Sequence, residues 1–299
     1  MATKAKTTTK SKAASARKTT SRAATSTKVV TKKSFTSRLD VVTPNALVGE
    51  AVGTFGLALA ALTAPADQPL LVGLMYVVLL VALMRVSGGH FNPAVSFGLW
   101  AANKLEGVKV PFYWVAQFIG ALAALLVVGQ FNGQGSSLDL STFTTWDWRT
   151  FWVEAIGTAV FVLGMVAVLK NVTGTAARAA GIGLSLTVGL VVAGGLLTAN
   201  ATQEQTVYQA SAQSGKAHTF TRTFAAQAPA LNPAIALAQT ERDVKAINKS
   251  IDPNGGGNVE QTKPSHFTWS TVLGALFGAA IGGNLYLILA GISRKSQTL

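Results

Sequence analysis

Six stretches of the chain are long and apolar enough for a helix of about 20 residues, the length that crosses a bilayer. They are residues 45–64, 69–87, 110–131, 150–170, 179–198 and 268–292. The composition agrees, because only 12% of the residues are charged, against about 25% in an ordinary soluble domain. The sequence therefore predicts an all-α membrane protein with six transmembrane helices.

The basic residues between these spans indicate how the chain is oriented. If the spans alternate in direction, one side of the membrane receives Arg85, Lys104, Lys109, Lys170, Arg178, Arg294 and Lys295. The loop 132–149, on the other side, holds Asp139, Asp147 and a single Arg149. Positive residues prefer the cytoplasmic side, so we expect a multi-pass protein of the plasma membrane with both termini in the cytoplasm.

The N-terminal segment differs in composition from the rest. Residues 1–38 are rich in Lys, Arg, Thr, Ser and Ala and have no apolar run that would form a signal peptide. Such a segment buries too little surface to fold, so we expect residues 1–40 to be a disordered basic tail in the cytoplasm. Contact with anionic lipid or nucleic acid is the alternative. No aromatic residue precedes Phe35, which disfavours nucleic acid.

An internal repeat divides the remaining residues, 41–299, into two halves. "GEAVGT" with Glu50 begins the half at 45–131, and "VEAIGT" with Glu154 begins the half at 150–292. Three spans per half place the two halves in opposite orientations, an arrangement found in many transport proteins. The second half also carries long polar insertions at 199–230 and 240–267, which would lie outside the cell.

Each half contains an Asn-Pro-Ala sequence, within "GGHFNPAVSFG" and "ALNPAIALA". Asn is a favoured N-cap and Pro fits the first turn of a helix. The apolar stretches that follow are too short to span, so each predicts a re-entrant half-helix. Because the repeat is inverted, the two N-termini would meet near the midplane, with the Asn92 and Asn232 amides as donors into a central path.

These motifs resemble those of the aquaporins, the major intrinsic protein family. The resemblance covers roughly residues 45–292 and also rests on "YWVAQFIGA" and "GLSLTVGL". It implies six helices, two half-helices, one pore per subunit and a homotetramer. It also implies that Glu50 and Glu154 accept hydrogen bonds from the re-entrant loops, which agrees with the need of a buried carboxylate for partners, and we expect His90 to brace the first loop. The predicted pore motifs are Asn92, Pro93, Ala94, Asn232, Pro233 and Ala234.

The selectivity positions depart from the family pattern. Typical members have Arg directly after the second Asn-Pro-Ala, where this chain has Ile235, followed by Ala236. The resemblance places the other constriction positions at Val72, Leu190 and Pro229, so all four are apolar. An apolar ring offers a solute no hydrogen bonds in exchange for lost hydration. We expect either a wide ring with weak discrimination or a tight ring that dewets and conducts poorly, and the short side chain of Val72 favours the wide one.

The function indicated is a passive channel for water or small uncharged solutes. The alternatives are a channel mainly for a larger neutral solute such as glycerol, and a non-conducting membrane scaffold or adhesion protein. No catalytic constellation stands out, so we expect no enzyme and no cofactor. The chain has no cysteine and only three scattered histidines, which disfavours a metal site. Gly274, Gly278 and Gly282 predict close helix packing.

Overall fold

The computed structural model describes residues 42–133, 138–214, 218–251 and 263–291. The tail predicted over residues 1–40 lies outside the described residues. The helices are, in chain order, α2 (Pro44–Thr63), α3 (Pro69–Ser87), α4 (Pro93–Ala101), α5 (Lys109–Phe131), α6 (Trp148–Asn171), α7 (Thr175–Gln213), α8 (Arg222–Ala225), α9 (Pro233–Ala238), α10 (Val244–Ile251) and α11 (Trp269–Leu289).

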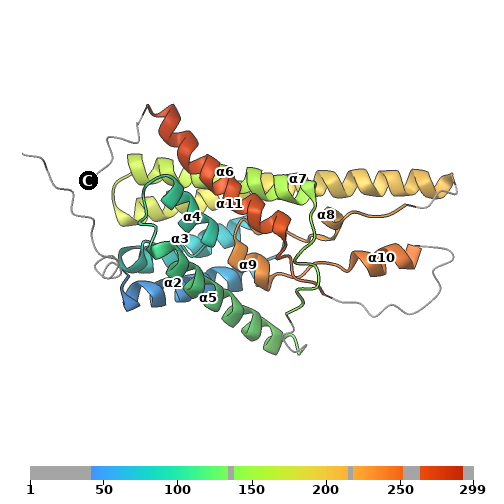
Figure 1. Cartoon of the computed structure of the whole chain (residues 1–299), viewed down its shortest axis with the longest axis horizontal. Helices are drawn as coiled ribbons and strands as arrows, with labels where there is room; N and C mark the ends of the chain where they lie inside the picture. The colour runs from blue at the N-terminus through green and yellow to red at the C-terminus, as the bar shows by residue number, and fades with distance from the viewer. Residues whose placement is uncertain (1–41, 134–137, 215–217, 252–262, 292–299) are drawn as a thin grey trace, which may run out of the picture.

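Six of these helices, α2, α3, α5, α6, α7 and α11, are long and apolar enough to cross a membrane. They form a bundle, and the short helices α4 and α9 lie inside it (Figure 1). No strand forms in the described ranges apart from a single bridge between Thr240 and Ser265. The predicted all-α membrane fold, with six spans and two half-helices, is confirmed.

The helix ends follow from local capping. The Asp147 carboxylate accepts from the backbone N–H groups of Arg149 and Thr150, at 2.8 and 3.1 Å, and starts α6. The Thr268 hydroxyl accepts from the N–H of Thr271 and starts α11. Gly88, with φ 96°, ends α3. These are the residue types that favour each kind of end.

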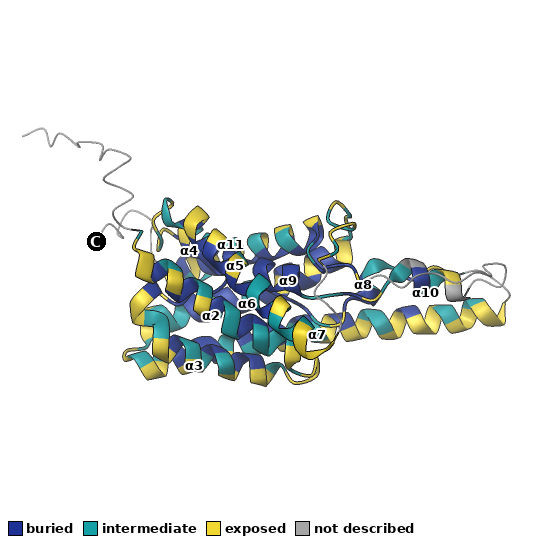
Figure 2. Cartoon of the chain, turned by 90° about the horizontal axis from the view of Figure 1, so that it is seen from below, coloured by how far each residue is buried: buried dark blue, intermediate teal, exposed yellow. Residues whose placement is uncertain are grey.

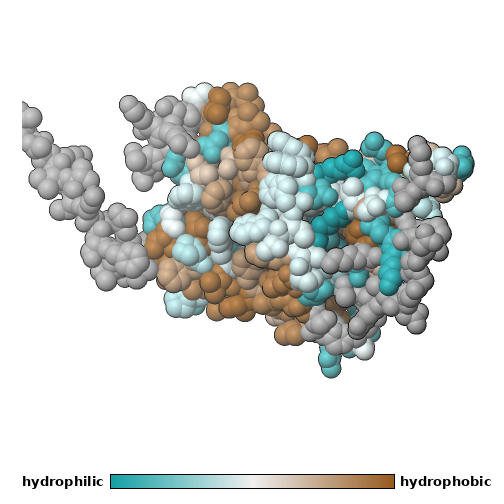
Figure 3. All heavy atoms as spheres, turned by 45° about the vertical axis from the view of Figure 1, so that its right-hand side comes forward, coloured by the Kyte–Doolittle hydropathy of each residue, from teal (hydrophilic) through white to brown (hydrophobic). Residues whose placement is uncertain are grey.

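The surface of the bundle is suited to lipid. Apolar side chains are exposed on its outer helices, including Val78 at 64%, Val115 at 60% and Leu126 at 62%. In Figure 3 hydrophobic residues cover the bundle, while hydrophilic ones gather at the end that carries α8 and α10. We call this polar end the outer end, and the opposite one the inner end.

Several basic residues lie at the inner end. The Arg85 Nε donates to the Thr175 hydroxyl, 3.3 Å away, which joins the end of α3 to the start of α7. Lys104 lies beside Lys170, and burial together with this neighbour lowers the pKa of Lys104 to about 8. Arg85, Lys104 and Lys170 thus lie at the same end of the bundle.

The fifth span is longer than predicted. The sequence placed its end at residue 198, with a polar insertion beyond, but α7 continues to Gln213. Its 39 residues correspond to about 58 Å, nearly twice the hydrocarbon thickness. The extension projects from the outer end with most of its residues exposed (Figure 2). Thr, Gln and Ala are compatible with a helix in water, so the change to polar residues at 199 does not end it.

The predicted glycine packing is confirmed between α6 and α11. A Cβ added to Gly274, Gly278 or Gly282 would lie 2.2 to 2.5 Å from a backbone carbonyl oxygen of α6. Those oxygens belong to Phe151, Ala155 and Ala159, which are also four residues apart. Only glycine therefore lets the two backbones approach this closely.

Candidate functional site

Asn92 and Asn232 are the N-caps of the two half-helices. The Asn92 Oδ1 accepts from the N–H of Ala94 at 2.7 Å, and the Asn232 Oδ1 accepts from the N–H of Ala234 at 3.0 Å. Pro93 and Pro233 occupy the first helical positions. Both asparagines are 2% exposed. The capping geometry is the one the sequence predicted.

The two re-entrant loops are also joined to each other. The Asn92 Nδ2 donates to the Leu231 carbonyl at 2.8 Å, and the Asn232 Nδ2 donates to the Phe91 carbonyl at 3.0 Å. Phe91 and Leu231 have positive φ angles, 48° and 51°. This strained conformation occurs at the same place in both halves and is sustained by the surrounding structure. The sequence did not reveal this reciprocal pair of bonds.

Glu50 and Glu154 accept hydrogen bonds from the two re-entrant loops. Glu50 accepts from the backbone N–H groups of His90 and Phe91 at 3.1 and 2.7 Å. Glu154 accepts from those of Ala230 and Leu231 at 2.9 and 2.8 Å. Each carboxylate is completely or almost completely buried, and these bonds compensate part of its lost hydration.

The glycine three residues after each glutamate makes room for the strained loop residue. A Cβ on Gly53 would lie 2.1 Å from the Phe91 ring. A Cβ on Gly157 would lie 2.6 Å from the Leu231 side chain. The repeated Glu-Ala-x-Gly-Thr pattern therefore combines a carboxylate that binds the loop with a gap that receives it.

His90 braces the first loop from inside it. Its Nδ1 lies 3.0 Å from the Ser96 hydroxyl, and its ring meets the Tyr113 ring edge-on. The Tyr113 hydroxyl donates to the Ser87 carbonyl at 2.7 Å. The His90 ring is not among the groups that line the cavity described below, in keeping with a supporting position.

The third partner of each glutamate differs between the halves. The Gln117 Nε2 donates to Glu50 at 2.7 Å. The packing of Gly120 against Ala51 matches that of Gly278 against Ala155, so the counterpart of Gln117, three residues earlier, is the apolar Ala275. Glu154 is instead met by the ring of His266, whose Nε2 lies 3.2 Å away.

His266 belongs to a buried charge cluster at the outer end, defined as Glu154, Arg222, Glu241 and His266. The His266 Nδ1 lies 2.5 Å from Glu241, and Arg222 pairs with Glu241 at 2.7 Å. Burial opposes the charge of His266, but hydrogen bonds to Glu154 and Glu241 outweigh it and raise its pKa to about 9. Burial lowers the pKa of Arg222, opposed by Glu241. His266 is therefore an imidazolium at neutral pH.

Sequence reasoning missed Arg222, Glu241 and His266. They lie in the two polar insertions, which the sequence described only as outside segments. The one available signal was the missing partner of Glu154, because Ala275 stands where the first half has Gln117.

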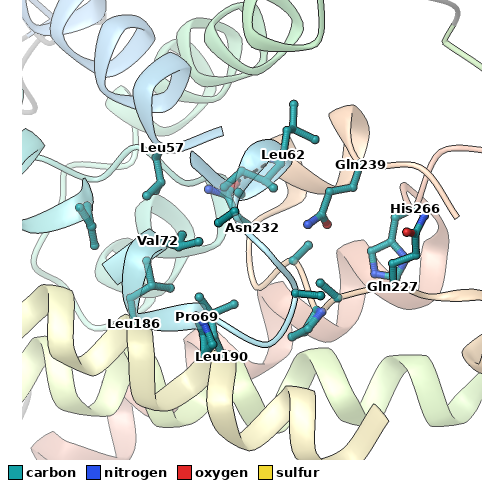
Figure 4. A pocket seen from close by; sticks show the side chains of 18 of the residues that line it. Leu57, Leu62, Pro69, Val72, Leu186, Leu190, Gln227, Asn232, Gln239 and His266 are labelled. Atoms are coloured by element: carbon teal, nitrogen blue, oxygen red, sulfur yellow. Dashed lines mark hydrogen bonds between the residues drawn. The ribbon is translucent and has the colours of Figure 1, made fainter. Parts of the chain in front are cut away.

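A cavity of about 260 Å³ runs beside the two asparagines (Figure 4). Asn92 and Asn232 both contribute to its wall. The structure also brings all four predicted constriction residues to this cavity, namely Val72, Leu190, Pro229 and Ile235. They come from α3, α7, the 226–232 loop and α9, so their common wall supports the alignment across the long insertion. Polar side chains line its outer part, at Gln227, Gln239, Thr240 and His266.

No set of three His, Asp or Glu side chains in the described ranges could hold a metal ion. The charged groups nearest the cavity are paired in the buried charge cluster. The cavity is therefore bounded by apolar side chains, carboxamides and paired charges.

The fold and the site together define a multi-pass membrane protein built from two inverted halves, with one capped half-helix from each half meeting at a shared cavity. A family model described as major intrinsic protein matches residues 48–203, just over half of the chain. The chain belongs to the major intrinsic protein family. The resemblance drawn from the sequence motifs is thus confirmed.

Several curated relatives are similar over shorter segments. A probable aquaporin TIP-type alpha of Phaseolus vulgaris is 47% identical over 16% of this chain and 18% of its own length. Aquaporin Z of Brucella melitensis is 40% identical over 26% and 29%. Aquaporin NIP3-1 of Arabidopsis thaliana is 32% identical over 50% and 52%. The chain thus spans at most about half the length of these relatives.

A solved structure is also similar. It is the X-ray structure of the aquaglyceroporin from Plasmodium falciparum, 20% identical, with a TM-score of 0.49, covering 83% of this chain and 98% of that one.

Proposed function

We propose that this protein is a passive channel that conducts water and small uncharged solutes along the cavity beside Asn92 and Asn232. The observation that carries the proposal is the pair of cavity-lining carboxamides, one from each half-helix. Each carboxamide nitrogen carries two N–H donors, and one of them is used between the loops. The second donor is available to a permeating molecule. Asn92, Pro93, Ala94 and their counterparts Asn232, Pro233 and Ala234 are then the pore motifs.

The outer ring, defined as Val72, Leu190, Pro229 and Ile235, is proposed as the constriction. It lacks a charged side chain and offers no hydrogen bond to a solute. Two of its four members, Val72 and Pro229, have short or cyclic side chains, which favours a wide opening and weak discrimination between water and small solutes. A channel mainly for a larger neutral solute such as glycerol is the second candidate, favoured by the same apolar ring.

We propose the membrane location, the orientation and the assembly of the protein from its basic residues and its family. The basic residues at the inner end support a cytoplasmic location for it, with both termini there and the protein in the plasma membrane. A homotetramer is implied by the resemblance to the family. We assign no catalytic role, no cofactor and no nucleic-acid partner.

Flux through reconstituted vesicles tests the proposal. The full chain in proteoliposomes should shrink them faster than empty vesicles in sucrose, which reports water, and re-swell them in glycerol or urea, which reports solute. Val72→Trp should block both fluxes, because the indole would fill the cavity at the outer ring. Val78→Trp, on the lipid-facing side of the same helix, is the matched control and should conduct normally.

These flux measurements distinguish the proposed channel from a channel mainly for a larger solute and from a non-conducting scaffold. Re-swelling without appreciable water flux would indicate the larger-solute channel. Vesicles with correctly inserted protein but no flux above the empty control would indicate the scaffold reading. Equal conduction by Val72→Trp and Val78→Trp would show that Val72 does not line the path.

A further inference from the structure

The outer part of the cavity contains a polar side chain that the outer ring does not explain. Gln239 is the C-cap of α9, seven residues after Asn232, and so about 10 Å farther out along the path. It lines the same cavity as the outer ring. In Figure 4 its side chain extends from α9 into the space between Asn232 and His266.

The backbone of Gln239 is fixed on both sides. Its N–H donates to the Ile235 carbonyl at 2.8 Å, and its carbonyl accepts from the N–H of His266 at 2.9 Å. The neighbouring Thr240 forms the bridge with Ser265. The side chain therefore projects from a rigid position, which lowers the entropic cost of binding.

The carboxamide of Gln239, in contrast, is not held by the protein through its oxygen. Its Oε1 is buried and has no hydrogen-bond partner in the described chain. Three other polar side chains of the cavity wall form hydrogen bonds with the protein. Gln227 donates to the Thr240 carbonyl at 3.2 Å, both ring nitrogens of His266 meet carboxylates, and the Tyr76 hydroxyl donates to the Gly89 carbonyl.

A buried carbonyl oxygen without a partner is costly. The terminal torsion of a glutamine is broad and roughly two-fold, so an unheld carboxamide can turn either its oxygen or its NH₂ group toward the cavity. It can then accept from a hydroxyl or amide N–H and donate to an oxygen. The group is neutral, and the charges nearest to it are paired, so it matches an uncharged solute that carries both donors and acceptors.

We infer that Gln239 forms an outer binding subsite for neutral hydroxyl- or amide-bearing solutes, and that it supplies the hydrogen bonds that Ile235 cannot. This inference rests on the proposed channel function. A solute would exchange part of its hydration for the Gln239 carboxamide before entering the apolar ring, and would meet the Asn232 amide beyond it.

Gln239→Met tests the subsite in full-length protein. Methionine keeps the length and flexibility of the side chain, and the backbone bonds of the cap are unaffected. Loss of one neutral hydrogen bond predicts a fall of about threefold to tenfold in the ratio of glycerol to water permeability. Gln203→Met is the matched control, because that carboxamide is exposed on the extension of α7 and does not line the cavity; its ratio should stay at the wild-type value.

The failure of this inference is distinct from the failure of the channel function. Wild-type protein that conducts, with an unchanged or raised ratio in folded Gln239→Met, overturns the subsite alone. Wild-type protein without flux overturns both. If Gln239→Met does not fold, Gln239→Leu gives the same comparison, and urea in place of glycerol must show the same direction of change.

Discussion

At the scale of single residues, the centre of the molecule depends on matched pairs of a glycine and a strained neighbour. Phe91 and Leu231 adopt positive φ angles directly before the capping asparagines. Their carbonyls are the acceptors that join the two loops. Gly53 and Gly157 leave the space that their side chains occupy. The short motif seen twice in the sequence is thus a packing requirement of the site.

Gly53→Ala should therefore disturb the pore from a distance. The new methyl group would meet the Phe91 ring at 2.1 Å, and overpacking of this kind costs about 1 to 3 kcal/mol. We expect a lower melting temperature and reduced water flux per folded channel. Gly56→Ala is the matched control on the same helix, because its methyl would touch only the flexible end of Leu79, 3.0 Å away. Equal effects of the two changes would contradict this account.

Ile235→Arg probes the outer ring at the same scale. An arginine there would narrow the cavity and add a cation beside the ring, so we expect solute flux to fall more than water flux. The glycerol-to-water permeability ratio measures this directly. An unchanged ratio would mean that Ile235 does not line the constriction.

At the scale of helices, length and apolarity predicted the six spans because lipid imposes a minimum length and apolar side chains. Capping chemistry predicted both half-helices, since Asn and Pro act locally. The end of α7 was missed because an apolar run marks only the part of a helix that lies in lipid, and a helix in water can continue with polar residues. Glu204 accepts from the N–H of Thr221 at 2.9 Å and holds the extension. No local sequence pattern predicts this contact.

The interface of α6 and α11 is the tightest test of helix packing. Gly278→Ala would place a methyl group 2.2 Å from the Ala155 carbonyl and force the helices apart. We expect a loss of about 1 to 3 kcal/mol in stability, measured as a lower denaturation temperature in detergent. Gly194→Ala in α7 has no atom within 4 Å of the new methyl and should be neutral or slightly stabilising. A stable Gly278→Ala protein would mean that the helices are farther apart than described.

At the scale of the whole molecule, the two halves are alike where the re-entrant loops meet but differ at their ends. In the first half, the third hydrogen bond to Glu50 comes from Gln117, which lies in the transmembrane helix α5. The second half uses His266 and thereby connects Glu154 to the polar insertions. The sequence could predict the shared part because it is repeated. It could not predict the buried charge cluster, whose members are brought together only by the folded insertions.

This connection predicts a dependence of stability on pH. The folded pKa of His266, about 9, exceeds its ordinary value near 6.5. The His266 imidazolium faces Glu154 and Glu241, and Arg222 is paired to Glu241. The imidazolium therefore adds stability that is fully present below about pH 6.5 and is lost as pH rises through 9. Thermal unfolding between pH 7 and pH 10 should show this loss in the wild-type protein. His266→Gln should be less stable at pH 7, by about 3 kcal/mol at most, and should lack most of the decline, whereas His218→Gln should retain it. Equal changes of stability with pH in the wild-type protein and in His266→Gln would mean that His266 is not the cation joining the two carboxylates, because the titration of other groups such as Lys104 is common to both proteins.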